Sequence, residues 1–441
     1  MSAEDLAVSS SPGVRASGQT LLAQSMADLS VAFGGGTDDP FVVYDRLQAQ
    51  GDVVEVDLLA AFGLRSKADS GEQSVFTLFR YADIQAVLRD GAVFTSSINQ
   101  RRIGFLFDDL MILGMDGDQH KFMRSLLQPA FGAAVIARWK ERMIAPLIEE
   151  EFIEPLAPSG RCDMMADFAI EFPVRAVYQI IGLPDDPAAY SNFATWGLQI
   201  LRAPTGDPDK NPAAVQATID AAIAASKGMY DQLKPIIAAR RASGMTEGDD
   251  LIGALLRASH AGESLDDHQI ACFLRTVMPA AAETTTRTFC NLMLMLLRDA
   301  DLLEEVRHDR SLIPAAIDEA VRLEPVLSII TREAQRDTTI AGVHIPAGSA
   351  LLLCTASAGR DESVYPDPEI FDLHRPRRSP LGFGSGPHMC IGMHVAKAEM
   401  EAALNAWLDH MPRLRLDPDY PPPSVKGVIF RGPAELRVRW D

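Results

Sequence analysis

The chain has 441 residues, and 47% of them are hydrophobic, which allows a substantial core in either two domains or one large one. Its 41 basic and 60 acidic residues give a net charge of −19, which argues against nucleic acid or an anionic membrane as a partner. The five cysteines are scattered and odd in number, which indicates a reducing cytoplasm and no disulfide framework.

The start of the chain carries no targeting or anchoring pattern. No segment approaches the ~18–20 apolar residues that cross a bilayer, and the first residues are acidic, so we expect neither a membrane anchor nor a signal peptide. Residues 1–36 are rich in Ser, Gly and Ala, which predicts a flexible tail with one short helix near 21–29. Residues 37–441 show no linker and are predicted to form one domain.

The hydrophobic pattern predicts a mainly helical fold with a small β region. Long helical stretches dominate residues 121–323 and are interrupted by clusters rich in Pro, Gly and Asp. The shorter predicted elements are helices at 44–47 and 82–88 and strands at 53–56, 76–79, 339–340, 344–345, 351–354 and 436–440.

The helix predicted over residues 275–297 has an unusual centre. Pro279 lacks an amide proton, so we expect a kink there. Glu283 and Thr284 follow, with two more threonines, although β-branched residues are poor helix formers. By themselves these residues favour a surface or salt-bridged acid at Glu283 and a hydroxyl that bends the helix at Thr284.

A loop of small residues, 383–392, ends in a single cysteine and runs into a helical pattern. Cys390 precedes that helix, where the amides of residues 391–393 are available to a negative sulfur, so we expect a lowered thiol pKa. One cysteine cannot build a tetrahedral zinc site, whereas one thiolate suits the axial ligand of a haem iron. The alternative is a glycine loop with a buried structural cysteine.

The order Phe, Gly, x, Gly, x, His, x, Cys, x, Gly in this loop resembles the haem-ligand signature of the cytochrome P450 family. The resemblance covers about residues 40–441 and implies the P450 fold in one domain, of the soluble, cytoplasmic bacterial type. It implies haem b as cofactor, with Cys390 as the axial ligand of the iron. The residues that it places around the haem are His120, Arg124, Ala281, Arg332, Phe383, Gly384, His388, Cys390 and Gly392.

The same resemblance assigns the oxygen-activation helix and its proton path. Thr284 would position a water or donate a hydrogen bond, and Glu283 would pass protons from solvent, as the catalytic pair. The family usually has glycine where this chain has Ala281, which narrows the groove for dioxygen by one methyl group. Pro279 would supply the distortion that glycine allows.

Glu319 and Arg322 share one helix face at i and i+3, which by itself describes a common surface ion pair. The resemblance implies instead a buried structural cluster with Arg375, which locks the ligand loop and takes no part in catalysis.

Candidate substrate contacts follow from the resemblance alone. They are Phe105, Phe107, Met111, Thr276, Ala280, Ser328, Ile329, Ile429 and Phe430. Most are apolar, which implies a small apolar organic substrate. Arg101 and Arg102 could anchor a carboxylate, although a solvated loop pair explains them as well.

The implied reaction uses O2 and inserts one oxygen atom by hydroxylation, epoxidation or oxidative dealkylation. The chain has no flavin or iron–sulfur motif, so the implied electron donor is an external ferredoxin that a flavin-dependent reductase reduces. The candidates for its docking are basic residues, with a solvated surface as the alternative: Arg375, Arg377 and Arg378, together with Lys121, Arg138 and Lys140. Two other functions stay open: a peroxide-driven haem-thiolate peroxygenase and a non-catalytic haem-binding or gas-sensing protein.

Overall fold

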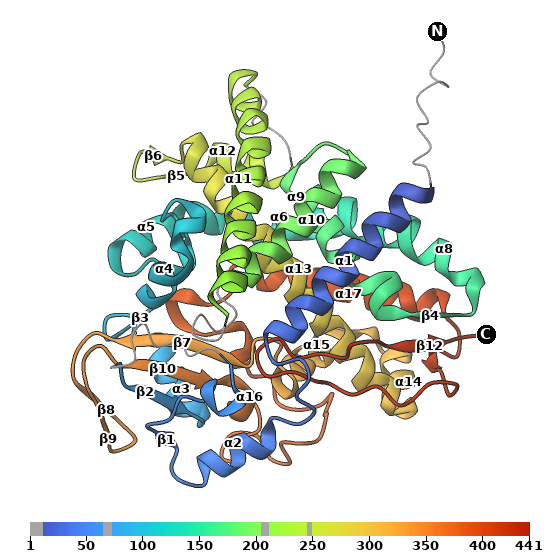
Figure 1. Ribbon diagram of the computed structural model, residues 1–441. Coiled ribbons are helices and arrows are strands. Elements are labelled where there is room, and N and C mark those ends of the chain that lie inside the picture. The colour runs from blue at the N-terminus through green and yellow to red at the C-terminus, as the bar shows by residue number, and fades with distance from the viewer. Residues whose placement is uncertain (1–11, 65–72, 204–210, 245–248) are drawn as a thin grey trace.

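The computed structural model describes residues 12–64, 73–203, 211–244 and 249–441. Helices fill most of the molecule, and the largest sheet lies at one side (Figure 1). The prediction of a mainly helical fold with a small β region is therefore confirmed. The α-helices are α1 (Pro12–Ala32), α2 (Phe41–Gln48), α3 (Tyr81–Arg89), α4 (Ser97–Ile103), α5 (Gly117–Leu127), α6 (Ala133–Trp139), α7 (Ala145–Ile148), α8 (Glu154–Leu156), α9 (Phe172–Ile181), α10 (Pro187–Arg202), α11 (Pro212–Ala242), α12 (Leu251–Arg257), α13 (Asp267–Arg298), α14 (Ala300–His308), α15 (Ile313–Leu323), α16 (Thr355–Ala358) and α17 (Met393–His410).

Short 3₁₀ and π segments join these helices. They are η1 (Ala60–Phe62), η2 (Gly104–Phe107), η3 (Ile112–Gly114), η4 (Gln128–Phe131), η5 (Lys140–Ile144), η6 (Glu149–Ile153), η7 (Ala157–Ser159), η8 (Met165–Ala169), η9 (Arg310–Leu312), η10 (Leu381–Phe383) and η11 (Gly386–His388). The strands are β1 (Val53–Val54), β2 (Val75–Leu78), β3 (Phe94–Thr95), β4 (Arg161–Asp163), β5 (Ser259–His260), β6 (Glu263–Ser264), β7 (Ile329–Ala334), β8 (Thr338–Ile340), β9 (Val343–Ile345), β10 (Ala350–Cys354), β11 (Arg415–Leu416) and β12 (Arg437–Arg439).

The main sheet has the strand order β1-β2-β10-β7-β3. Its central strand β10 reads Ala-Leu-Leu-Leu-Cys and is buried throughout, as expected for a strand covered on both faces. The antiparallel register with β7 pairs Leu351 with Arg332. The sheet therefore carries one of the predicted haem contacts on a rigid, buried strand.

Helix α13 is the long central helix of the domain. Most of its residues from Ile270 to Leu297 are buried, and it contacts α9, α10, α11, α15 and α17. An all-round apolar surface of this kind is what a helix in the middle of a large core requires. The helix continues without a break through Pro279, so the kink expected there does not interrupt it.

The N-terminal segment differs from the flexible tail with a short helix that its composition predicts. Residues 12–32 form the single helix α1, which packs against α10 (Figure 1). Leu22, Met26 and Leu29 are buried on one face, and Phe33 packs edge-to-face on Phe430 with the ring centroids 4.9 Å apart. The helix docks because these apolar side chains, spaced at i, i+4 and i+7, form one apolar face. The small residues between them dominate the composition, which therefore predicted a flexible tail. Within the described residues, no helix is long and apolar enough to span a membrane.

Candidate active site

The loop before α17 presents one thiol. The amide of Cys390 donates to the carbonyl of Phe383 (2.9 Å), which closes the loop, and Gly384 and Gly386 have φ angles of 73° and 70°, which favour glycine. The amides of Gly392 and Met393 donate to the sulfur. Of the five cysteines, Cys390 is the one whose side chain is exposed.

The thiol pKa departs from the sequence-based expectation. Cys390 is exposed as a residue, but many protein atoms surround its thiol, and this burial raises the thiol pKa. The amides of Gly392 and Met393 and the guanidinium of Arg124 act in the opposite direction without reversing it. The expectation of a lowered pKa was wrong because it counted the amide donors and omitted burial.

A cluster of four basic side chains lies beside this loop. His120 and Arg124 come from α5, Arg332 from β7 and His388 from the loop itself. The rings of His120 and His388 lie 4.1 Å apart between centroids, and Arg124 Nη2 donates to the carbonyl of Met389 (2.8 Å). The structure therefore brings together the four basic residues that the resemblance places around the haem.

This cluster is partly buried and holds four basic side chains beside one nearby acid. His120 is 3% exposed, and its Nε2 is buried without a partner in the described structure. Burial and, as the second largest cause, the positive charge of His388 lower the pKa of His120 to about 4. Burial also lowers the pKa of Arg332 to about 10. Asp116 is the nearby acid, 3.4 Å from His388 Nε2. The arrangement suits an anionic group with carboxylates, and a haem whose iron meets Cys390 and whose propionates meet this cluster fits it.

The catalytic pair predicted on α13 has an unexpected partner. Glu283 is fully buried, and its Oε1 accepts a hydrogen bond from Arg287 Nε one turn further on, while its Oε2 is buried without a partner. Burial raises the pKa of Glu283, and Arg287 opposes the shift. Arg287 was not assigned from the sequence, although its i, i+4 spacing from Glu283 is the signal that indicates such a pair.

Thr284 is half-buried, and its Oγ1 donates to the carbonyl of Ala280 (2.8 Å). The neighbouring Ala281 is half-buried as well. A second buried acid that the sequence reading missed, Glu399 on α17, accepts a hydrogen bond from Thr285, and burial raises its pKa to about 8. No local spacing links Thr285 to Glu399, because the two helices meet only in the folded chain.

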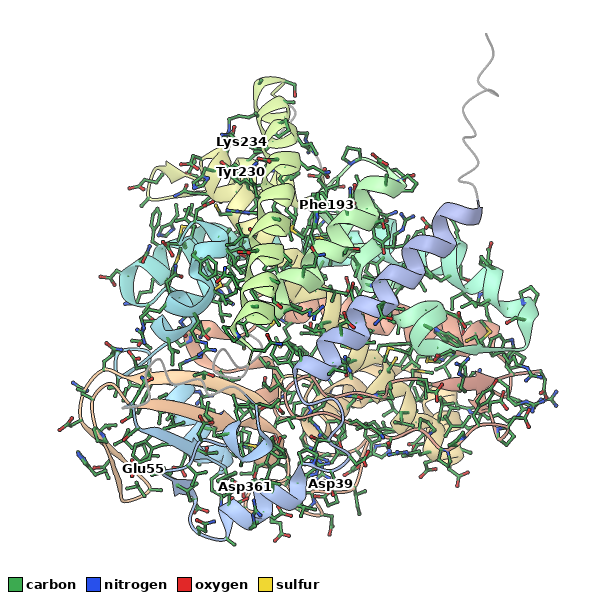
Figure 2. All side chains as sticks on the ribbon, in the orientation of Figure 1. Asp39, Glu55, Phe193, Tyr230, Lys234 and Asp361 are labelled. Carbon is green, nitrogen blue, oxygen red and sulfur yellow. The ribbon has the colours of Figure 1, made fainter. Side chains whose placement is uncertain are left out.

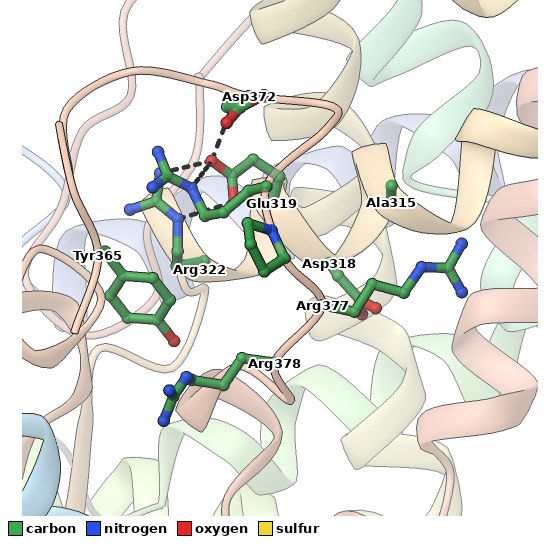
Figure 3. A pocket seen from close by; sticks show the side chains of 10 residues that line it. Ala315, Asp318, Glu319, Arg322, Tyr365, Asp372, Arg377 and Arg378 are labelled. Carbon is green, nitrogen blue, oxygen red and sulfur yellow. Dashed lines mark hydrogen bonds and ion pairs between the residues drawn. The ribbon is translucent and has the colours of Figure 1, made fainter.

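The three residues assigned to the structural cluster meet on the side of α15 that faces the segment 366–375 (Figure 3). Arg322 donates to both carboxylate oxygens of Glu319 (2.8 and 2.7 Å), and Arg375 Nε donates to one of them (2.9 Å). The remaining guanidinium protons go to backbone carbonyls, among them those of Gly359 and Pro366. The small pocket around this cluster contains no Cys390 and is separate from the cofactor site.

The residues proposed to contact substrate differ in what they offer. Phe107, Met111, Ile329, Ile429 and Phe430 are buried, whereas Phe105 is 45% exposed and Ala280 is exposed. The hydroxyl of Ser328 donates to the carbonyl of Val428, and that of Thr276 donates to the carbonyl of Cys272 (3.1 Å). Both hydroxyl protons are therefore used within the protein in this conformation, and the remaining side chains of the set are apolar.

A thiol in a glycine loop, four basic side chains beside it and a central helix with an acid and an alcohol indicate a haem-thiolate protein. Comparison with known proteins agrees. The family model described as Cytochrome P450 matches residues 62–431. The chain is 31% identical to the cyclomarin C epoxidase of Salinispora arenicola, over 82% of this chain and 90% of that protein. It is 29% identical to the mycinamicin IV hydroxylase/epoxidase of Micromonospora griseorubida, over 85% and 92%.

Solved structures show the same fold. A versatile cytochrome P450 enzyme from Bacillus subtilis superposes with a TM-score of 0.76 at 26% identity, covering 91% of this chain and all of the other. The chain belongs to the cytochrome P450 family and is a haem-thiolate monooxygenase. When bound, the haem supplies the binding and activation of oxygen, and the protein's residues hold the haem and shape the site around it.

Proposed function

We propose that the chain inserts one oxygen atom of O2 into a small apolar organic substrate, using electrons from an external ferredoxin that a flavin-dependent reductase reduces. The observation that carries this proposal is the thiol of Cys390, an exposed residue, whose sulfur accepts from two backbone amides beside four basic side chains. The relatives, an epoxidase and a hydroxylase/epoxidase, support hydroxylation or epoxidation as the reaction.

The apolar nature of the substrate is supported by the side chains available to it. Phe107 and Met111 are buried and apolar, and they follow Arg101 on the same stretch of chain. Arg101, the candidate carboxylate anchor, forms an ion pair with Glu333 on β7. A substrate carboxylate would have to compete with that partner, which favours an uncharged substrate.

Proton delivery is proposed to use Glu283 and Thr284. The two residues are adjacent on α13. Oε2 of Glu283 has no hydrogen-bond partner among the described residues, so it is the oxygen available for proton transfer. Arg287 holds the other oxygen, so the carboxyl group has to rotate or take up a water to pass a proton to Thr284. Thr284 would exchange its bond to Ala280 for one to the reacting oxygen.

Electron delivery is proposed to occur near Arg377 and Arg378, which are exposed and border the pocket at the Glu319 cluster (Figure 3). The other basic candidates are less suitable than the sequence indicates. Lys140 pairs with Glu401 (2.7 Å) and Lys121 with Asp118 (3.2 Å), and Arg375 belongs to the buried cluster. Two exposed arginines on an acidic protein would steer an acidic partner to one place.

The test supplies purified protein with a [2Fe–2S] ferredoxin, its flavin reductase, NADPH and 18O2. The substrate panel consists of small apolar compounds, and mycinamicin IV, on which a relative acts, is tested beside it as a larger compound. We expect one 18O atom in the product, NADPH consumption that tracks product, and a several-fold higher KM for ferredoxin in Arg377→Glu.

Two parallel reactions separate the alternatives. Product formed with hydrogen peroxide but not with ferredoxin would show a peroxygenase, and tight CO or NO binding with no turnover of any compound would favour a gas sensor. Either result would overturn the proposed electron source.

A further inference from the structure

A second polar cluster lies away from the cofactor site, where residues 104–111 meet α11 and α13. Its centre is Arg275 on α13, whose side chain is 4% exposed. Its Nη2 donates to Asp108 Oδ2 (2.5 Å), and its Nη1 donates to the carbonyl of Leu106 (3.3 Å) and to Ser226 Oγ (3.1 Å). One guanidinium therefore ties a loop and two helices together.

The α11 side of the cluster adds further contacts. Tyr230 lies on α11 (Figure 2), and the guanidinium carbon of Arg275 lies 4.9 Å from its ring centroid, close enough for a cation–π contact. The hydroxyl of Tyr230 is 2.9 Å from His268 Nδ1 on α13, and the hydroxyl of Ser226 donates to the carbonyl of Leu106. The two Nη atoms of Arg275 thus have partners on both helices and on the loop, whereas its Nε is buried without a partner among the described residues.

The loop does not hold its conformation by local preference alone. Asp108 and Asp109 have φ angles of 51° and 58°, two successive non-glycine residues in the left-handed region. Such a backbone is costly unless its surroundings stabilise it. The ion pair between Asp108 and Arg275 stabilises this backbone, because it joins the carboxylate of a strained residue to a buried guanidinium group.

Asp108, His268 and Cys272 also have the side chains and spacing of a metal site, with their ligand atoms within 4.8 Å of one another. Arg275 Nη2 contacts two of the three, at 2.5 Å from Asp108 and 3.0 Å from Cys272 Sγ. A divalent ion placed among them would lie against a fixed positive charge. The arginine already supplies the cation, so the cluster serves to hold the loop.

The loop that Arg275 holds carries the first group of proposed substrate contacts, Phe105, Phe107 and Met111, and Arg275 itself precedes Thr276 on α13. We propose that Arg275 is a positioning residue for substrate selection, which holds residues 104–111 against α11 and α13 and so determines how large substrates enter and lie. This proposal rests on the proposed function, since it concerns the substrate of that reaction. Moving the loop away would leave a buried guanidinium without its carboxylate, so the closed arrangement is favoured.

The variants that test this are Asp108→Asn, Arg275→Gln and Arg275→Lys. Asp267→Asn is the matched control, because Asp267 pairs with Arg241 (2.6 Å) between the same two helices without touching the loop. The probes are 4-phenylimidazole, a bulky haem ligand, and cyanide, a small one, with stopped-flow association rates. KM, kcat and the product ratio are measured for any compound from the panel that is turned over.

We expect Asp108→Asn and Arg275→Gln to bind 4-phenylimidazole at least several-fold faster and to change KM or the product ratio more than kcat. Cyanide binding and the CO difference spectrum should match the unmodified protein, Arg275→Lys should restore part of the effect, and Asp267→Asn should show none. Equal rates for Asp108→Asn and the unmodified protein, or equal acceleration of both ligands, would overturn the inference. If Arg275→Gln does not fold, Asp108→Asn decides. Loss of the thiolate CO spectrum in the unmodified protein would instead count against the proposed function.

Discussion

At the scale of single residues, the site combines groups whose charges are set by burial more than by their neighbours. His120, Arg332 and Glu283 are all shifted toward their neutral forms mainly by desolvation. Thr284 is different, since it is half-buried and its hydroxyl donates to a carbonyl of its own helix, that of Ala280. Its hydroxyl can therefore be changed with little effect on the fold.

Replacing Thr284 by valine keeps the β-branched shape and removes the hydroxyl. We expect the fraction of NADPH that ends in product to fall by about 10-fold or more, because a positioned proton donor typically contributes 10²–10⁴-fold. Thr284→Ser retains the hydroxyl and should stay near the parent value. The measurement is product formed per NADPH consumed, and equal coupling in Thr284→Val would remove this residue from the proton path.

Glu399 should make stability depend on pH. Burial raises its pKa from 4.5 to about 8. Between these values the unfolded chain releases a proton that the folded chain keeps, so the free energy of unfolding falls as pH rises, by up to about 1.4 kcal/mol per pH unit. Below 4.5 both states are protonated and the effect is absent, whereas above 8 it is complete and constant.

Glu399→Gln removes this titration. We expect the variant to match the parent at pH 4.5 to 5 and to become progressively more stable than the parent up to pH 8, in denaturant unfolding followed by circular dichroism. A stability difference that does not change with pH would contradict the assignment of a protonated carboxyl group.

At the scale of elements, two contacts lie around the ligand loop: the Glu319 cluster joins α15 to the segment 366–375, which precedes the loop, and the loop itself closely approaches the end of α3. Gly386 shows the second contact, because a Cβ there would lie 2.5 Å from the carbonyl oxygen of Leu88. The first contact is electrostatic and the second steric.

Glu319→Gln should destabilise the protein strongly. It leaves two buried guanidinium groups without their shared carboxylate, and breaking a buried pair in this way costs about 3–5 kcal/mol. Glu304→Gln is the matched control, since Glu304 also pairs with an arginine at i+3 but is 50% exposed, where such pairs contribute about 0–1 kcal/mol. Similar unfolding midpoints in urea for both variants would contradict the structural role.

Gly386→Ala should displace the ligand loop. The new methyl group would meet the backbone of α3, and a φ of 70° adds about 1–2 kcal/mol of backbone strain. Gly91→Ala, whose Cβ would lie at an ordinary 3.7 Å from Pro387, faces the same loop without strain. We expect a lower haem content and a lower Tm in Gly386→Ala but not in Gly91→Ala. Equal haem content in the two variants would show that the loop shifts to accept the methyl group and still binds haem.

At the scale of the whole molecule, the sequence predicts most of the architecture because local patterns carry it. The apolar run that forms β10 and the glycines before Cys390 are local signals, and both appear in the structure within a residue of where they are expected. The helix α1 was underestimated because its docking depends on α10 and Phe430, which are distant in the sequence.

Some features of the candidate site can be predicted from the sequence, and others depend on the tertiary fold. Motif spacing identifies Cys390, His120 and Glu319, and the fold assembles them with their partners. Motif spacing does not give the buried state of Glu283 or the pairing of Asp108 with Arg275, because both depend on which groups the tertiary fold excludes from water. Desolvation is a property of the folded chain, and so the pKa of Cys390 was also predicted in the wrong direction.

The most direct test of the account is the CO difference spectrum of the reduced, haem-loaded protein. A thiolate from Cys390 predicts a strongly red-shifted Soret band, lost in Cys390→Ser and retained in Cys162→Ser, where the cysteine is half-buried in another part of the fold. A band at the position of histidine-ligated haem, or a red-shifted band that survives Cys390→Ser, would contradict the central claim that this sulfur holds the iron.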